Sequence, residues 1–140
     1  MTITKAQRQI VETRAGGCCE YCLMPENAST VAFHVDHIIP LKHEGTDDDD
    51  NLCFACVKCN TYKGSDIGGF DPLTGKLTHL YHPRLQKWAD HFELKSDMHI
   101  LGRTPEGRST VRLFRMNDEA RVETRQILLE TGDYPCIPPE

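Results

Sequence analysis

Apolar and polar residues follow helical and strand periods in turn along the chain. Residues 4–15 are predicted to form a helix, because Thr4 can cap the first turn, apolar residues recur on one face, and two glycines follow. Residues 31–36 alternate between apolar and polar side chains, which is typical of a half-buried strand, and Pro40 stops it. The N-terminal part therefore starts with a helix and a strand, separated by a cluster of cysteines.

A second strand and a short helix complete this part of the pattern. Residues 51–55 read as a strand after a polar loop, and residues 56–63 read as a knuckle leading into a helix that Gly64 ends. From about residue 67 the pattern changes to short elements around turns. It predicts a turn at 70–76 between two strands, the second at 77–81, then helices at 84–92 and 109–116, a strand at 98–101, and a last helix capped at 117 or 118.

The composition is that of a folded protein with the length of one ordinary domain. Of the 140 residues, 39% are apolar and 26% are charged, and the formal net charge is −5. This acidity counts against a passive nucleic-acid binder, which usually carries a basic surplus. Four acidic side chains form the run from Asp47 to Asp50, which we interpret as a solvated loop, so most of the acidity belongs to one loop.

Hydrophobicity and cysteine content indicate in which cellular compartment the protein is expected. No apolar run approaches the roughly 18 residues that span a bilayer, and the first residues show no signal-peptide hydrophobic region, so we expect a cytoplasmic protein without a membrane partner. Seven cysteines are many for a reducing compartment, and metal ligation is the better explanation for them. Cys136, alone near the C-terminus, is expected to be unpaired, and Cys18 competes with its neighbour Cys19 as a ligand.

Two Cys-x-x-Cys pairs, Cys19 with Cys22 and Cys56 with Cys59, can give one zinc ion its tetrahedral set of four thiolates. Such a pair places both sulfurs on one side of a tight knuckle. Cys53 and Cys56 have the same spacing, so the choice of the second pair is ambiguous from spacing alone. We favour Cys56 and Cys59 because Cys53 lies in an apolar strand. A structural zinc ion is therefore predicted.

The segment between these pairs, with the helix that follows, carries the residue types needed for phosphodiester hydrolysis. That reaction needs a base to activate water and a divalent cation, held by oxygen ligands, to neutralise charge on the phosphate and the leaving oxygen. His37 is a candidate base, Asp36 supplies an anionic oxygen, and Asn60 supplies a neutral carbonyl oxygen. His34 shares the strand face of Asp36 and is a further candidate for contact with metal or phosphate.

These residues occur in one ordered pattern from Cys19 to Gly64. It reads Cys-x-x-Cys, Val-Asp-His-Ile-x-Pro, Asn-Leu, and Cys-x-x-Cys-Asn-x-x-Lys-Gly. The pattern resembles the HNH (ββα-metal, or His-Me finger) endonuclease family in its four-cysteine form. The resemblance implies an α+β fold with a zinc-pinned ββα-metal core over residues 1–66 and a C-terminal α/β extension, residues 67–140, packed on it.

The resemblance also implies a metal-dependent endonuclease that hydrolyses DNA phosphodiester bonds, with double-stranded DNA as its partner. His37 is the implied general base, and Asp36 and Asn60 are the implied ligands of a catalytic Mg²⁺ or Mn²⁺. Asn51 is implied to tie the loop so that His37 points correctly. Lys63 is expected to contact a DNA phosphate.

A rival interpretation is a zinc module that binds DNA or protein without catalysis. Such a module requires the four cysteines but has no use for Asp36, His37 and Asn60 together. A plasmid-nicking assay with Mg²⁺ or Mn²⁺ distinguishes the two interpretations.

Overall fold

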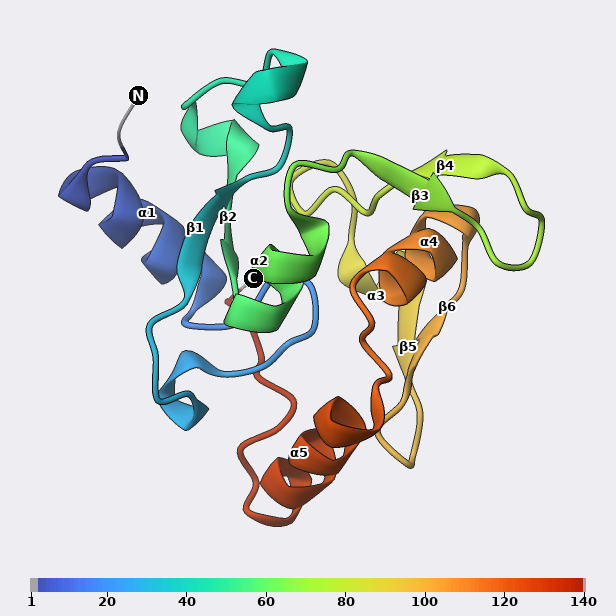
Figure 1. The fold of residues 1–140 in the computed structure, drawn as a ribbon. Coiled ribbons are helices and arrows are strands. Elements are labelled where there is room, and N and C mark those ends of the chain that lie inside the picture. Colours follow the sequence, from blue (N-terminus) through green and yellow to red (C-terminus); the bar gives the residue numbers. More distant parts are fainter. Residues whose placement is uncertain (1–2, 140) are drawn as a thin grey trace.

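The computed structural model describes residues 3–139 as a mixed α+β fold with small antiparallel sheets (Figure 1). The predicted α+β class is therefore correct. In chain order the helices and strands are α1 (Lys5–Ala15), β1 (His34–His37), β2 (Leu52–Ala55), α2 (Val57–Lys63), β3 (Gly68–Phe70), β4 (Leu77–His79), α3 (Trp88–His91), β5 (Phe92–Leu94), β6 (Ile100–Gly102), α4 (Pro105–Leu113) and α5 (Glu119–Glu130).

Helix α1 forms where the sequence predicts it. The Thr4 hydroxyl accepts a hydrogen bond from the Gln7 main-chain amide, and the Gln7 side-chain oxygen accepts one from the Thr4 main-chain amide, so a capping box starts the helix. Gly16 ends it in the left-handed region, at φ 64°. Val11 and Ala15 are the buried positions of α1 and belong to the main hydrophobic cluster.

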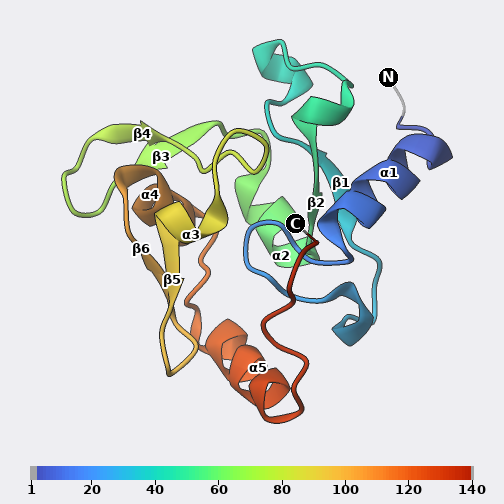
Figure 2. The same cartoon turned by 180° about the vertical axis from the view of Figure 1, so that it is seen from behind.

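Strands β1 and β2 form an antiparallel hairpin in which Asp36 lies opposite Cys53 and His37 lies opposite Leu52. Helices α1 and α2 lie on opposite sides of this hairpin, as both Figure 1 and Figure 2 show. Every residue of β2 is buried as a result. The order β1, β2, α2 is the ββα arrangement that the sequence resemblance implies.

The C-terminal part packs on this core through long-range contacts. The Trp88 indole donates a hydrogen bond of 2.8 Å to the Tyr21 carbonyl, and the Tyr134 hydroxyl donates one of 2.7 Å to the Cys22 carbonyl. Phe114 meets the Tyr21 ring edge to face at 4.9 Å. These contacts converge on the first cysteine knuckle, and the division of the chain at residue 66 stays a prediction.

Two predicted helices in this part have different bounds. The predicted helix at 84–92 is only α3, because the His82 ring accepts the main-chain N–H groups of Arg84 and Leu85 and bends the chain into a turn. Strand β5 then starts at Phe92. Helix α4 starts earlier than predicted, because the Thr104 hydroxyl caps it and a proline follows at its first position.

The expectation that Cys136 is unpaired is wrong. Cys136 forms a disulfide with Cys18, which lies 118 residues earlier in the chain. Cys18 is therefore not available as a metal ligand in place of Cys19. Because the two cysteines are so far apart in sequence, nothing local in the chain indicates that they pair.

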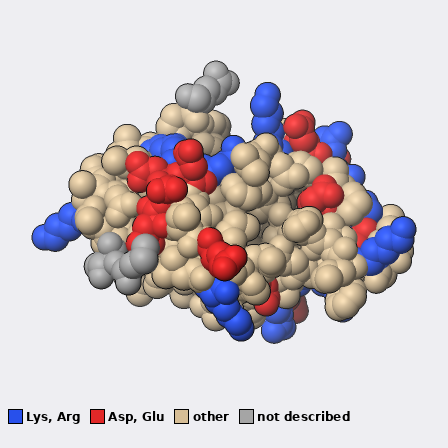
Figure 3. Space-filling view, turned by 90° about the horizontal axis from the view of Figure 1, so that it is seen from above, with Lys and Arg blue, Asp and Glu red and all other residues tan. Residues whose placement is uncertain are grey.

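Charged side chains are unevenly distributed on the face of the molecule seen in Figure 3. Acidic side chains gather over the part of Figure 3 that corresponds to the segment between β1 and β2, and the surface next to them is largely uncharged. Within residues 3–139, no helix has both the length and the apolar character that crossing a membrane requires.

Candidate functional site

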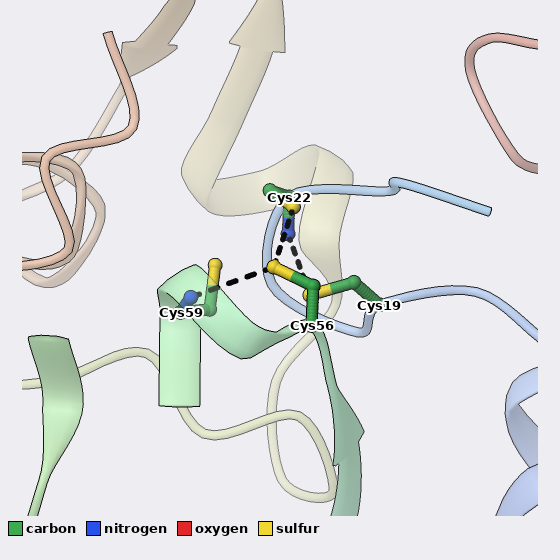
Figure 4. Close-up of side chains that lie close together, drawn as sticks. All are labelled: Cys19, Cys22, Cys56 and Cys59. Carbon is green, nitrogen blue, oxygen red and sulfur yellow. Dashed lines mark hydrogen bonds between the residues drawn. The ribbon is translucent and has the colours of Figure 1, made fainter. Parts of the chain in front are cut away.

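Four cysteine thiols meet between the first knuckle and the start of α2 (Figure 4). The sulfur atoms of Cys19, Cys22, Cys56 and Cys59 lie within 4.8 Å of one another, and all four residues are buried. The Cys22 and Cys56 sulfurs are 3.7 Å apart. A tetrahedral zinc site with Zn–S bonds near 2.3 Å needs sulfurs about 3.8 Å apart, so this cluster fits zinc.

Main-chain geometry prepares both knuckles for a metal ion. The Cys22 amide points at the Cys19 sulfur at 3.5 Å, and the Cys59 amide points at the Cys56 sulfur at 3.4 Å. Cys56 is also the N-cap of α2. Each knuckle therefore stabilises negative charge on its first sulfur before any ion binds.

The four buried cysteines can all be ionised only together with a bound cation. Burial raises the pKa of the Cys19 and Cys59 thiols, while hydrogen bonds from Cys19 and the other two thiols lower the pKa of Cys22. Four thiolates in one buried cluster need a neutralising ion, which zinc would supply. Arg121 from α5 adds to this, with its guanidinium 3.2 Å from the Cys59 sulfur. Burial opposes the charge on Arg121, but the Cys59 and Cys22 sulfurs raise its pKa overall.

Cys53 lies outside the cluster. Its thiol donates to the Tyr21 hydroxyl at 3.5 Å, and it is paired across the hairpin with Asp36. Burial raises the pKa of Cys53 to about 12, and the nearby carboxylate of Asp36 adds to the effect. The geometry therefore brings Cys56 and Cys59, not Cys53 and Cys56, to the first knuckle.

Asp36 projects from β1 toward α2, where Lys63 meets it. The Lys63 ammonium lies 3.1 Å from Asp36 Oδ2 and donates a hydrogen bond of 2.8 Å to the His37 carbonyl. Burial raises the pKa of Asp36, and the Lys63 charge opposes that rise. Asp36 Oδ2 is buried and makes no well-formed hydrogen bond within residues 3–139. Because the Lys63 ammonium already lies beside Oδ2, a hard cation would have to bind Asp36 through its other oxygen, Oδ1.

The expected contact of Lys63 with a DNA phosphate is wrong for this structure. Lys63 is only 2% exposed, and its ammonium is held by Asp36 and the His37 carbonyl. The sequence places a cation at the end of α2, but only the packing of α2 on β1 shows that the side chain points inward. Lys63 therefore acts on the position and charge of Asp36.

His37 ends β1 and is half-buried beside the acidic loop. Its Nε2 atom lies 2.7 Å from Asp47 Oδ1. The Asp47 carbonyl in turn accepts a hydrogen bond of 2.8 Å from the Gln7 side chain, which anchors the loop to α1. The sequence did not predict the contact between His37 and Asp47, because nothing in a run of four aspartates shows which side chain faces inward.

Asn51 connects the two ends of the loop between β1 and β2. Its side-chain oxygen accepts a hydrogen bond from the Ile39 amide, and its side-chain nitrogen donates to the Ile39 and Thr46 carbonyls, at 2.7 to 2.8 Å. Gly45 lies under this bridge, where a Cβ atom would stand 1.7 Å from the Ile39 carbonyl oxygen. The structure shows the loop tied by Asn51, and its effect on the orientation of His37 stays a prediction.

Asn60 on α2 and His34 on β1 are the other two predicted ligands of the catalytic cation. Asn60 lies on α2 one turn before Lys63, so both residues are on the face toward β1. Its side-chain amide forms no hydrogen bond within the described part of the chain, which leaves its oxygen free for a ligand. His34 is exposed and shares the strand face of Asp36, two residues away. Their roles as metal ligands stay predictions.

The comparisons with known proteins agree with this geometry. Residues 19–66 match the family model for HNH endonuclease, which covers the two cysteine pairs, the β1–β2 hairpin and α2. Neither the curated proteins nor the solved structures include a significant match to the chain. With the buried cluster of four cysteines inside the matched segment, residues 19–66 form an HNH endonuclease domain of the four-cysteine type.

Proposed function

We propose that this protein is a metal-dependent endonuclease that hydrolyses DNA phosphodiester bonds. The observation that carries the proposal is the contact of Lys63 with both the Asp36 carboxylate and the His37 carbonyl, which places α2, the helix that carries Asn60, against the end of β1. A module that only binds through its zinc site has no need for a buried carboxylate beside a half-buried histidine. The HNH match gives the reaction class.

In the proposed reaction His37 acts as the general base. Its imidazole takes a proton from a water molecule as the water oxygen attacks phosphorus, and the bond from phosphorus to the 3′ oxygen breaks. The leaving oxygen then takes a proton from solvent. Asp47, hydrogen bonded to Nε2, holds the ring so that the other ring nitrogen, Nδ1, faces the water. A catalytic Mg²⁺ or Mn²⁺ would supply neutralisation of the charge on the phosphate and leaving oxygen.

The residues beside β1 fit such a cation. Asp36 and Asn60 would bind it through a carboxylate and an amide oxygen, and His34 is a further candidate ligand. The support for this assignment is the chemistry of the donor set, a carboxylate on β1 and a side-chain amide on α2, which are oxygen ligands that such a cation takes. Lys63 keeps Asp36 in place on the side away from solvent.

The test of the function is nicking of supercoiled plasmid DNA by the full chain, with Mg²⁺ or Mn²⁺ added to zinc-loaded protein. We expect conversion of supercoiled plasmid to open-circular plasmid that depends on the added ion. DNA binding without cleavage under any of these ions would favour the non-catalytic zinc module.

Asp47→Ala is expected to lower kcat for nicking by about 10-fold to 100-fold with little change in KM, because a small misplacement of the base costs rate more than binding. Asp47→Asn should keep more activity, since its amide can still hydrogen bond to Nε2. The matched control is Asp50→Ala, which removes an exposed charge from the same run. Equal losses in Asp47→Ala and Asp50→Ala would show that only the loop charge matters.

Asn60→Ala is expected to lower activity in a way that excess Mg²⁺ partly restores, because the cation would lose one oxygen ligand. Asn60→His is the sharper variant, since an imidazole nitrogen should move the ion preference from Mg²⁺ toward Mn²⁺, Co²⁺ or Ni²⁺. Nicking rates of parent and variant across these ions measure the effect. An active Asn60→His protein with the ion preference of the parent would show that residue 60 is not a ligand.

A further inference from the structure

The zinc cluster has a charged neighbour from outside the matched HNH segment. Arg121 lies in the first turn of α5, well beyond residue 66, where the family match ends. Its guanidinium donates a hydrogen bond of 3.2 Å to the Cys59 sulfur, and the same nitrogen lies 3.9 Å from the Cys56 sulfur. Within residues 3–139 no other lysine or arginine side chain donates to the four sulfurs. The C-terminal part therefore supplies the cationic donor at the metal centre.

The Arg121 guanidinium is also held in place by groups other than the sulfurs. Its second terminal nitrogen donates a hydrogen bond of 2.6 Å to the Phe114 carbonyl and lies 3.3 Å from the Arg115 carbonyl. Phe114 is the C-cap of α4 and belongs to the main hydrophobic cluster, so this acceptor is part of a packed region of the fold. A guanidinium fixed in this way loses little further freedom when it contacts the sulfurs.

Cys59 differs from the first cysteine of each knuckle in the source of its donor. The Cys19 and Cys56 sulfurs face main-chain amides of their own knuckles. The Cys59 sulfur has no amide donor within the described part of the chain and takes its hydrogen bond from Arg121 instead. Because Cys59 is fully buried, solvent water does not reach its sulfur in the folded chain. The Arg121 contact is therefore not one that solvent duplicates.

The charge of the zinc centre gives this contact its energetic weight. Four thiolates and one Zn²⁺ together carry a net charge of about −2, and burial of uncompensated charge is unfavourable. The Arg121 guanidinium offsets part of that charge through a charge-assisted hydrogen bond, which is stronger than one from a neutral amide. Mutation of a group that hydrogen bonds to a metal ligand typically costs about 10-fold to 100-fold in metal affinity.

We propose that Arg121 is a positioning residue of the zinc centre, and that its contact with the Cys59 sulfur raises the affinity of the chain for zinc. Arg121 acts through Cys59 and does not bind the ion itself. The proposal rests on the zinc site and is independent of the proposed nuclease reaction. It also means that the C-terminal part completes the metal centre of the HNH domain, a role outside the match over residues 19–66.

The first measurement is the zinc affinity of the full chain, by competition with a chromophoric chelator. Arg121→Met keeps an unbranched apolar stem but removes every donor, and it should bind zinc about 10-fold to 100-fold more weakly than the parent. Arg121→Lys keeps a positive charge and a donor, so it should lose less affinity. Circular dichroism of the zinc-loaded proteins checks that both variants fold.

Cobalt gives a readout that a purely structural role would not change. Co²⁺ takes the place of Zn²⁺ in a tetrahedral site of four sulfurs, and its near-ultraviolet absorption reports charge transfer from sulfur to metal. Loss of the hydrogen bond makes the Cys59 sulfur a stronger electron donor, so this band should move to lower energy in Arg121→Met. The visible bands, which report the tetrahedral geometry, should stay as in the parent.

Two matched controls separate this role from effects of surface charge and of packing. Arg115→Met removes an exposed arginine side chain that pairs with Asp118, just before α5. Val122→Ala shortens a buried side chain of α5 beside Arg121 but leaves the guanidinium. Arg115→Met should keep the zinc affinity of the parent. Both controls should keep its cobalt spectrum, although Val122→Ala should unfold at a lower temperature.

Two results would overturn the proposal for Arg121. One is an Arg121→Met protein with the zinc affinity of Arg115→Met, and the other is an Arg121→Met protein with the charge-transfer band of Val122→Ala. A parent chain that binds neither zinc nor cobalt would overturn the zinc assignment and this proposal together. Absence of plasmid nicking by a zinc-loaded parent would overturn only the nuclease function, so the failures are distinguishable.

Discussion

Replacement of His37 by alanine is expected to lower the rate of plasmid nicking by about a hundredfold or more, the usual scale for a general base. The fold should be unaffected, because His37 lies at the end of β1, outside the main hydrophobic cluster, and the side-chain contact it loses is the hydrogen bond to Asp47. The Lys63 ammonium binds the His37 carbonyl, which alanine retains. Nicking rates, zinc content and the circular dichroism of the variant measure the effect.

His99→Ala is the matched control for this variant. His99 is an exposed histidine whose ring pairs with Asp97 in the turn between β5 and β6. The His99→Ala protein should nick plasmid at the rate of the parent protein. A folded, zinc-loaded His37→Ala protein with the activity of the parent would refute the proposed base, although not the HNH fold.

The parts of the fold that could be predicted are those set by local chemistry. The capping box at Thr4, the alternation along β1 and the two knuckles each fix their own segment within a few residues. The four cysteines were the strongest signal, because their paired spacing has few other uses. The predicted end of α2 at Gly64 is confirmed, because this residue takes a φ of 52°, which favours glycine.

The parts that could not be predicted depend on contacts between distant segments. The disulfide joins Cys18 to a cysteine 118 residues away, and Arg121 reaches the metal centre from α5. The inward orientation of Lys63 follows from how α2 packs on β1, and that packing has no signature in the seven residues of α2. The sequence also could not show which of the four aspartates contacts His37, because only the folded loop brings Asp47 to the His37 ring.

Loss of the zinc site is expected to unfold the HNH domain. Structural zinc contributes about 10–16 kcal/mol in small zinc domains, which equals or exceeds the usual net stability of about 5–15 kcal/mol. Cys56→Ser should have the largest effect, because Cys56 both belongs to the cluster and caps α2 with its side chain. We expect one zinc per parent chain, little or none in the variant, and loss of the folded N-terminal part.

Trp88 gives a direct readout of this loss, because it is the chain's single tryptophan and its indole is hydrogen bonded to the Tyr21 carbonyl, between Cys19 and Cys22. Cys56→Ser should therefore give the red-shifted emission of a solvent-exposed indole, and chelation of zinc from the parent should give the same spectrum. The matched control is Cys53→Ser, whose buried thiol contacts only the Tyr21 hydroxyl among the polar groups of the described residues. It should retain zinc and the emission of the parent, with some loss of thermal stability. If Cys53→Ser loses zinc and Cys56→Ser keeps it, Cys53 rather than Cys56 is the ligand, and the arrangement of the cluster described above is wrong.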